Sequence, residues 1–402
     1  MTAALALTAT ALILPAAPPA SADTGQCTFP AEPYRGRPWA LQRVLLDELW
    51  NESTGKGVNV AVIDTGVDTK HPQLAGAVDK SKGRNTLPAK PENDDGDPVP
   101  RGKADGTGDT VGHGTRVAGI IAARPAEGTG FVGLAPAARI IPVHQNDAHG
   151  NGTADTLATS IRHAVDAGAH VINISQDTAN AVKPTSALQQ EIDRALDRDV
   201  VVVASAGNDG LGGNVKKTYP ASFRGVLAVA ASDRNNERAA FSQSGDFVGV
   251  AAPGVDMVST VPGGGHCVDN GTSFAAPYVA AVAALLRAKH PDWTGREIVA
   301  QIEQTAERSV AGHDRLVGWG VVDPVRALTE DERRIDEPVA DEGLSRAQAP
   351  AVPEFDLGES AAERDARLAT YVAVAALVLA AALGGTALAL RDAARRRGGR
   401  RT

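Results

Sequence analysis

Five short runs of Val, Ile and Ala, separated by segments that contain Gly, Pro, Asn or Asp, constrain this sequence most. Runs of this kind are typical of strands that are buried on both faces. Residues 153–167 and 187–198 have helical apolar spacing and lie between such runs. This alternation predicts an α/β fold with a mostly parallel, twisted sheet covered by helices on both faces. The runs are Val58–Ile63, Arg139–Val143, His170–Ile174, Val200–Ala204 and Gly225–Ala230.

The C-terminal region contains an uncharged stretch of 23 residues, Leu368–Leu390. A bilayer core is crossed by about 20 helical residues, so the stretch predicts one C-terminal transmembrane helix at 368–390. Six arginines follow between Arg391 and Arg401. By the positive-inside rule, residues 391–402 form an Arg-rich cytoplasmic tail and the bulk of the chain is extracytoplasmic, at the cell membrane. A buried core helix is the alternative interpretation.

The N-terminal 22 residues have the features of a signal peptide. An apolar run, Leu5–Ala17, precedes the small-x-small sequence Ala20-Ser21-Ala22, although no Lys or Arg comes before the run. We therefore predict a signal peptide at 1–22, and a short buried helix is the alternative.

The remaining segments divide by composition. Residues 23–54 form an N-terminal extension that is first Pro-rich and then amphipathic over Trp39–Trp50, where we expect a surface helix. Residues 55–328 form the core domain, and residues 81–109 form an inserted loop with hardly any large apolar side chains. Residues 329–367 are charged and rich in Pro and Ala, as expected of a flexible spacer.

The charge pattern excludes some partners. The formal net charge is −8, and no folded stretch combines clustered Lys and Arg with aromatic residues, so no nucleic acid partner is expected. Acidic residues in the inserted loop are interpreted as solvated charge instead of a calcium site, and we expect no metal and no organic cofactor. These residues are Asp94, Asp95, Asp97, Asp105 and Asp109.

The chain contains two cysteines, Cys27 and Cys267. An exported compartment is oxidising enough to maintain a disulfide, so we predict that they pair. Two unrelated free thiols are the alternative, because separation along the sequence says nothing about distance in space.

Three segments place reactive side chains where an α/β sheet keeps its site, at the carboxyl ends of strands. Asp64 ends an apolar strand and precedes a Gly-containing turn; His113 lies between two glycines; Ser273 precedes a helix rich in Ala. Alone, each has an ordinary structural explanation: a turn or cap, a structural imidazole, and a helix N-cap. Together they supply a carboxylate, a base and a hydroxyl nucleophile.

The order Asp, His, Ser and the motifs Val62-Ile-Asp64-Thr-Gly, Gly112-His113-Gly-Thr and Gly271-Thr-Ser273-Phe-Ala-Ala-Pro resemble those of the subtilases, or subtilisin-like serine proteases of peptidase family S8. The resemblance extends from about Gly55 to Leu328. It implies a subtilisin-like fold and a serine endopeptidase with a polypeptide substrate. Catalysis is then assigned to Asp64, His113 and Ser273.

The resemblance also assigns roles outside the triad. Asn208 is expected in the oxyanion hole, and one wall of the substrate pocket is expected to contain Ser175, Gln176 and Asp177, with Ala206 and Gly207 also binding substrate. Many subtilases have Ser-Leu-Gly where this chain has Ser175-Gln176-Asp177. These side chains either admit polar or basic substrate residues or narrow the pocket.

The whole-chain organisation resembles that of the mycosins, the membrane-anchored subtilases of actinobacterial type VII secretion systems. The resemblance implies that residues 23–54 wrap around the protease domain and that the partners include the cytoplasmic membrane and type VII secretion channel components. It leaves a second hypothesis open, a mainly structural or assembly role with limited proteolysis.

Overall fold

The computed structural model describes residues 27–89, 101–147, 152–175, 185–213, 217–341 and 361–398. The chain divides into two units, residues 1–342 and 343–402. The signal peptide predicted at 1–22 lies outside the described residues.

The first unit is built on a seven-stranded, parallel sheet with the order β2-β3-β1-β4-β5-β6-β7. All five predicted strands are present within one or two residues of their expected bounds, which confirms the predicted α/β fold. The structure adds β2 and β7 at the two edges. The strands are β1 Asn59–Asp64, β2 Arg84–Asn85, β3 Arg139–His144, β4 Val171–Ile174, β5 Val201–Ser205, β6 Leu227–Ser232 and β7 Val248–Pro253.

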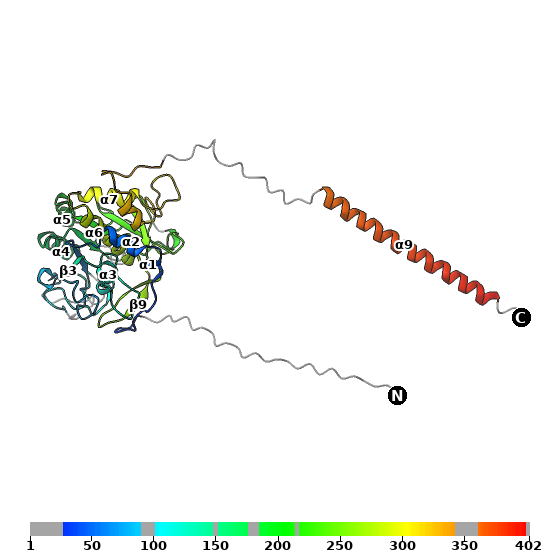
Figure 1. Cartoon of the computed structure of the whole chain (residues 1–402), viewed down its shortest axis with the longest axis horizontal. Coiled ribbons are helices and arrows are strands. Elements are labelled where there is room, and N and C mark those ends of the chain that lie inside the picture. The colour runs from blue at the N-terminus through cyan, green and yellow to red at the C-terminus, as the bar shows by residue number, and fades with distance from the viewer. Residues whose placement is uncertain are drawn as a thin grey trace, which may run out of the picture. The chain divides into compact units, whose positions relative to one another are not determined.

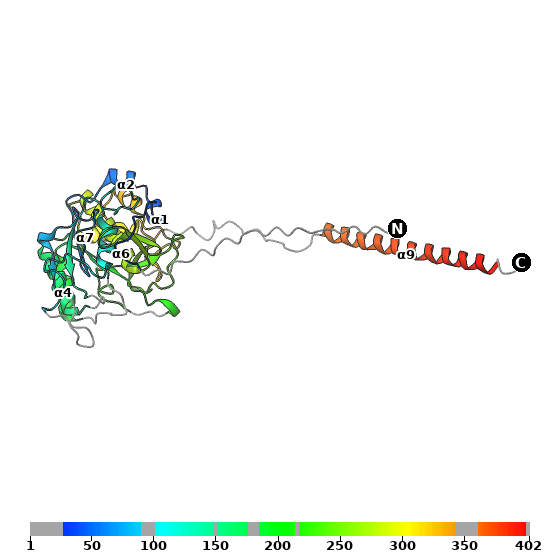
Figure 2. The same cartoon turned by 90° about the horizontal axis from the view of Figure 1, so that it is seen from below.

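Helices cover both faces of this sheet, as predicted. On one face α4 (Ala154–Asp166) and α5 (Ser186–Asp197) bury their apolar sides against the strands. The other face carries α3 (His113–Ala122), α6 (Thr272–Lys289), α7 (Gly295–Gln304) and α8 (Pro324–Thr329). The helices on this other face form a second layer, to which α1 and α2 of the N-terminal extension also belong. Figures 1 and 2 show α4 well separated from α1 and α2.

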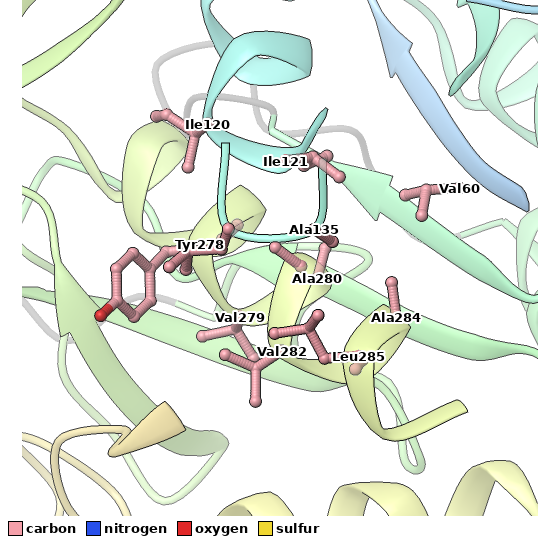
Figure 3. Packing of buried hydrophobic residues seen from close by; sticks show 14 of the residues in the cluster. Val60, Ile120, Ile121, Ala135, Tyr278, Val279, Ala280, Val282, Ala284 and Leu285 are labelled. Atoms are coloured by element: carbon pink, nitrogen blue, oxygen red, sulfur yellow. The ribbon is translucent and has the colours of Figure 1, made fainter. Parts of the chain in front are cut away.

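Helix α6 forms the centre of that second layer. Its residues 272–287 are all buried, which explains why it is made almost entirely of small and aliphatic side chains. Tyr278, Val282 and Leu285 of α6 belong to the same buried cluster as Ile121 of α3 and Val60 of β1 (Figure 3). The two helices that begin with His113 and just before Ser273 are therefore packed into one core.

The N-terminal extension lies on the first unit. Instead of one amphipathic helix over Trp39–Trp50, it forms α1 (Trp39–Gln42) and α2 (Leu46–Glu52). The indole at each end is held separately: Trp39 Nε1 donates to the carbonyl of Val255 and Trp50 Nε1 donates to that of Leu134, each at 2.9 Å. Buried indole N–H groups need such partners.

The extension is also joined covalently to a two-stranded antiparallel hairpin, β8 (Met257–Thr260) and β9 (His266–Asp269). The predicted disulfide between Cys27 and Cys267 is present, with Cα atoms 5.8 Å apart. Backbone hydrogen bonds from Ala31 to Gly264 and from His266 to Glu32 continue the contact.

The inserted loop is more ordered than its composition suggests. Within residues 81–109, the described parts contain β2, which pairs with β3 and so extends the sheet. Asn85 explains this placement: it is buried, and its side-chain amide donates to the carbonyl of Arg101 at 2.5 Å.

Part of the predicted spacer at 329–367 also belongs to the first unit. Arg334 pairs with Asp292, Arg296 pairs with Glu337, and the amide of Val339 donates to Gln304. Residues 330–341 therefore lie against α7 and the segment before it.

The second unit contains α9, Ala361–Gly398. This helix is long and apolar enough to cross a membrane, and it includes the span predicted at 368–390.

Candidate active site

Asp64 is the last residue of β1, at the point where the strand order reverses. β1 lies between β3 and β4: the chain places β2 and β3 on one side of it and then β4 to β7 on the other. Open parallel sheets form ligand sites at the carboxyl ends of strands at this position. The Asp64 side chain is fully buried, and its Oδ1 accepts a hydrogen bond from the amide of Thr65 at 2.8 Å.

His113 is the first residue of α3, after Gly112 in a left-handed conformation with φ of 83°. Gly114 follows because a Cβ at that position would lie 2.2 Å from the carbonyl oxygen of Gly66. The Gly-His-Gly sequence thus lets the helix start directly against the turn that follows Asp64.

The imidazole of His113 and the carboxylate of Asp64 form a hydrogen-bonded pair. His113 Nδ1 lies 2.8 Å from Oδ1 and 3.0 Å from Oδ2, so Nδ1 is the donor to Asp64 and Nε2 is left for the reaction. Burial opposes the charged imidazole, but the charge of Asp64 and its hydrogen bond outweigh this effect. The pKa of His113 consequently lies above its usual value.

Ser273 is the second residue of α6, and the helix N-cap is Gly271. The alternative explanation of Ser273 as a simple N-cap is therefore wrong. Its side chain is almost completely buried, with 3% of the residue exposed.

Phe274, the residue after Ser273, lies beside the imidazole of His113. Its ring centroid lies 5.4 Å from that of His113, with 45° between the ring planes. Among the described residues, no hydrogen bond joins the Ser273 hydroxyl to the imidazole of His113. Catalytic hydrogen bonds of this type are often long before substrate binds.

Asn208 follows β5 and faces the start of α6. Its Oδ1 accepts hydrogen bonds from the amide of Thr272 at 2.9 Å and from the Thr272 hydroxyl at 3.0 Å. These two donors define the side-chain orientation, and Nδ2 is then the donor directed away from Thr272. Nδ2 lies beside Gly271, two residues before Ser273: a Cβ added at Gly271 would be 3.6 Å from Nδ2.

The other expected substrate-binding residues follow β4 and β5. Ser175 is buried and accepts a hydrogen bond from Asn173 at 2.8 Å. Ala206 is buried, and Gly207 donates its amide to the Thr272 hydroxyl at 3.1 Å. Gln176 and Asp177 lie outside the described residues.

Asp109 was wrongly interpreted as solvated loop charge. It is buried and accepts hydrogen bonds from the hydroxyls of Thr65 and Thr115 and from the amides of Val111, Gly112 and Thr115. Burial raises the pKa of Asp109. The carboxylate organises the approach to α3, through backbone and hydroxyl partners that the sequence pattern does not reveal.

Within the described ranges, no group of three or more His, Cys, Asp or Glu side chains is arranged as a metal-ligand set. The arrangement instead offers a carboxylate, an imidazole and a hydroxyl. These groups are sufficient for acyl transfer without a cofactor.

The sequence model of the subtilase family matches residues 55–320. The chain belongs to the subtilase family. Two relatives of this subtilase support the assignment along almost their whole length. Subtilisin Savinase from Lederbergia lenta is 38% identical over 286 residues, 71% of this chain and 96% of the relative. Thermitase from Thermoactinomyces vulgaris is 36% identical over 300 residues, 74% of this chain and 99% of thermitase. The protein is thus a subtilisin-like serine endopeptidase.

Solved structures similar to this subtilase include mycosins. The MycP3 protease from the type VII (ESX-3) secretion system matches with a TM-score of 0.63 and 33% identity, over 75% of this chain and 90% of that structure. MycP1 from Mycobacterium smegmatis matches with a TM-score of 0.62 and 31% identity, over 80% of this chain and 91% of that structure.

Proposed function

We propose that this subtilase is a membrane-anchored endopeptidase whose catalytic triad is Asp64, His113 and Ser273. The observation that carries the proposal is the 2.8 Å contact between Asp64 and His113 Nδ1, together with the packing of the same imidazole on Phe274, next to Ser273. This contact fixes the tautomer that a general base requires.

In the proposed reaction, His113 Nε2 takes the proton from the Ser273 hydroxyl as the oxygen attacks a substrate carbonyl. Asp64 stabilises the imidazolium that forms. His113 then donates the proton to the leaving amine, and the acyl group remains on Ser273. Water repeats the sequence, with His113 again as base, and releases the carboxylic acid product.

The tetrahedral oxyanion requires hydrogen-bond donors that are fixed before it forms. We assign this role to Nδ2 of Asn208 and the backbone N–H of Ser273. The assignment is supported by the two hydrogen bonds that hold Oδ1 of Asn208 toward Thr272.

We further propose that α9 anchors the enzyme in the cytoplasmic membrane, with the protease domain outside and the Arg-rich tail inside. The length and composition of α9 and the arginines between Arg391 and Arg401 support this topology. The similarity to MycP3 and MycP1 supports a role beside a type VII secretion channel.

The Ser273→Ala variant tests the enzymatic role and separates it from assembly. The full-length variant, expressed in the native host in place of the wild-type protein, should lose peptide cleavage and the processing of secreted substrates. Restored secretion without cleavage would identify assembly as the essential role. Undiminished peptide cleavage by the purified variant would contradict the proposed nucleophile.

Topology is tested separately. Proteinase added to intact cells that lack an outer barrier should degrade the protease domain and spare an epitope placed after Thr402. Loss of the C-terminal epitope would contradict the proposed orientation.

A further inference from the structure

Arg116 lies one helical turn after His113 on α3, and its side chain is only 12% exposed. Its Nε donates to the carbonyl of Gly112 at 3.1 Å, and its Nη1 pairs with Oδ2 of Asp269. These contacts direct the guanidinium across the start of the helix, toward the hairpin strand β9.

The same guanidinium lies over the ring of Phe274, with its central carbon 5.4 Å from the ring centroid. Phe274 is also 5.4 Å from the imidazole of His113. One aromatic side chain, adjacent in sequence to the nucleophile, therefore contacts both the catalytic base and the guanidinium. A cation over an aromatic ring is attracted to its face, which favours one ring position.

Charged side chains from several elements surround the imidazole of His113. Asp64 at the end of β1 and Asp109 before α3 are negative and favour the protonated form of His113. Arg116 on α3 is positive and lowers the pKa of His113. Asp269 on β9 is paired with Arg116 and reduces the positive charge that reaches the imidazole.

We propose that the Arg116–Asp269 ion pair is a positioning unit of the active site, which holds Phe274 against His113 and balances the charge beside the catalytic imidazole. This inference rests on the proposed roles of His113 and Ser273. Arg116 acts through Phe274 and His113; it is assigned no contact with substrate.

Asp269 lies two residues after Cys267 on the same strand. The disulfide to Cys27 therefore ties the strand that carries Asp269 to the N-terminal extension. The extension thereby supports one partner of the ion pair from outside the catalytic core.

The test measures the rate at which a fluorophosphonate labels Ser273 in the full-length protein in detergent, as a function of pH. Labelling requires neutral His113, so the rate falls at low pH. The pH at which it falls, the acid limb of the pH profile, reports the pKa of the imidazole. Arg116→Gln removes the positive charge and should move the limb to higher pH by about half a unit. Asp269→Asn leaves Arg116 uncompensated and should move the limb to lower pH by a similar amount.

Two further variants separate charge from packing. The double variant with both substitutions should return the limb close to the wild-type position. Arg116→Lys keeps the charge but loses the planar fork, so its limb should stay in place while its maximal labelling rate falls about tenfold. Arg162→Gln, which removes the ion pair between Arg162 on α4 and Glu191 on α5, serves as the matched control and should change neither quantity.

Limbs that do not move, or that move in the same direction for Arg116→Gln and Asp269→Asn, would overturn the inference. Thermal unfolding of each variant shows whether it is folded. If Arg116→Gln does not fold, the results expected for Arg116→Lys and Asp269→Asn still test the inference. Absence of label on Ser273 in the wild-type protein would instead contradict the proposed function.

Discussion

Thr272 donates two hydrogen bonds to a single atom of Asn208: its amide and its hydroxyl both contact Oδ1, at 2.9 and 3.0 Å. The residue before the nucleophile thus orients the side chain assigned to the oxyanion hole. Gly207 donates to the same hydroxyl at 3.1 Å, which links β5 to the start of α6. The start of α6, which carries the proposed nucleophile, and the proposed oxyanion donor are consequently linked by one small hydrogen-bond network.

Replacing Asn208 by Ala should lower kcat by about 10²–10³-fold with little change in KM, because the lost donor acts on the tetrahedral intermediate. Thr272→Val should lower kcat less, by about tenfold, because the backbone N–H still holds Oδ1. Steady-state kinetics with a peptide substrate measures both. Additive effects in the double variant would contradict the idea that Thr272 acts through Asn208.

The pH profile reports the pairing of Asp64 with His113. Because the pKa of His113 is raised and the base must be neutral, kcat/KM should increase with pH and reach half its maximum above pH 6.5. Asp64→Asn removes the charge that raises the pKa and leaves burial to lower it. Its acid limb should therefore move to lower pH, and kcat should fall by about four orders of magnitude. An unmoved limb would show that Asp64 does not govern the imidazole.

The disulfide should stabilise the first unit. Cys27 and Cys267 are 240 residues apart, and the chain-entropy model gives about 5 kcal/mol for closing so long a loop, with measured losses of about 2–5 kcal/mol. Urea unfolding of a form that starts at residue 23 should show a loss in this range for Cys27→Ser/Cys267→Ser. The double variant should also become insensitive to reductant. If reductant destabilises the double variant as much as the wild type, the effect of reductant does not come from this disulfide.

His266 should make stability depend on pH. Burial, and the neighbouring His71, lower its pKa to about 4. Its Nδ1 accepts a hydrogen bond from the amide of Tyr34 at 3.1 Å, and its Nε2 contacts Gln73 Oε1 at 2.8 Å. Protonation of Nδ1 would therefore place its new N–H against the N–H of Tyr34. The folded state binds fewer protons than the unfolded state between pH 4 and pH 6.5. The stabilisation is therefore present above pH 6.5 and is lost as the pH falls toward 4, in total about 3 kcal/mol.

The measurement is the free energy of unfolding at pH 7.5 and pH 4.5 for wild type and His266→Gln. The variant should lose much of the difference between the two pH values. His163→Gln, which alters a contact with the Lys82 carbonyl at 2.9 Å, is the matched control and should retain the wild-type difference. If His266→Gln keeps the full pH dependence, another group is responsible.

The sequence predicted the strands whose two faces are both buried, because continuous apolar runs have few other stable environments. β2 was not predictable in this way, since Arg84 and Asn85 are polar and join the sheet only through pairing with β3. β7 was also missed, because Gly249 and Pro253 weaken its strand pattern. These edge strands depend on contacts that are distant in sequence.

The proposed triad could be assigned from the sequence because Asp64, His113 and Ser273 each lie in a short motif with its own local geometry. Asp109 was not, because its partners are backbone amides and threonine hydroxyls, which no charge pattern indicates. Arg116 is similar: its partner Asp269 is 153 residues away and meets it only after the hairpin packs on α3.

The most direct test is labelling of the full-length protein with a fluorophosphonate, followed by peptide mass mapping. The account predicts one covalent adduct, on the peptide that contains Ser273, formed faster as the pH rises through the pKa of His113 and abolished in Ser273→Ala. An adduct on a different residue, or equal labelling of Ser273→Ala, would contradict the assignment of Asp64, His113 and Ser273 as one catalytic unit.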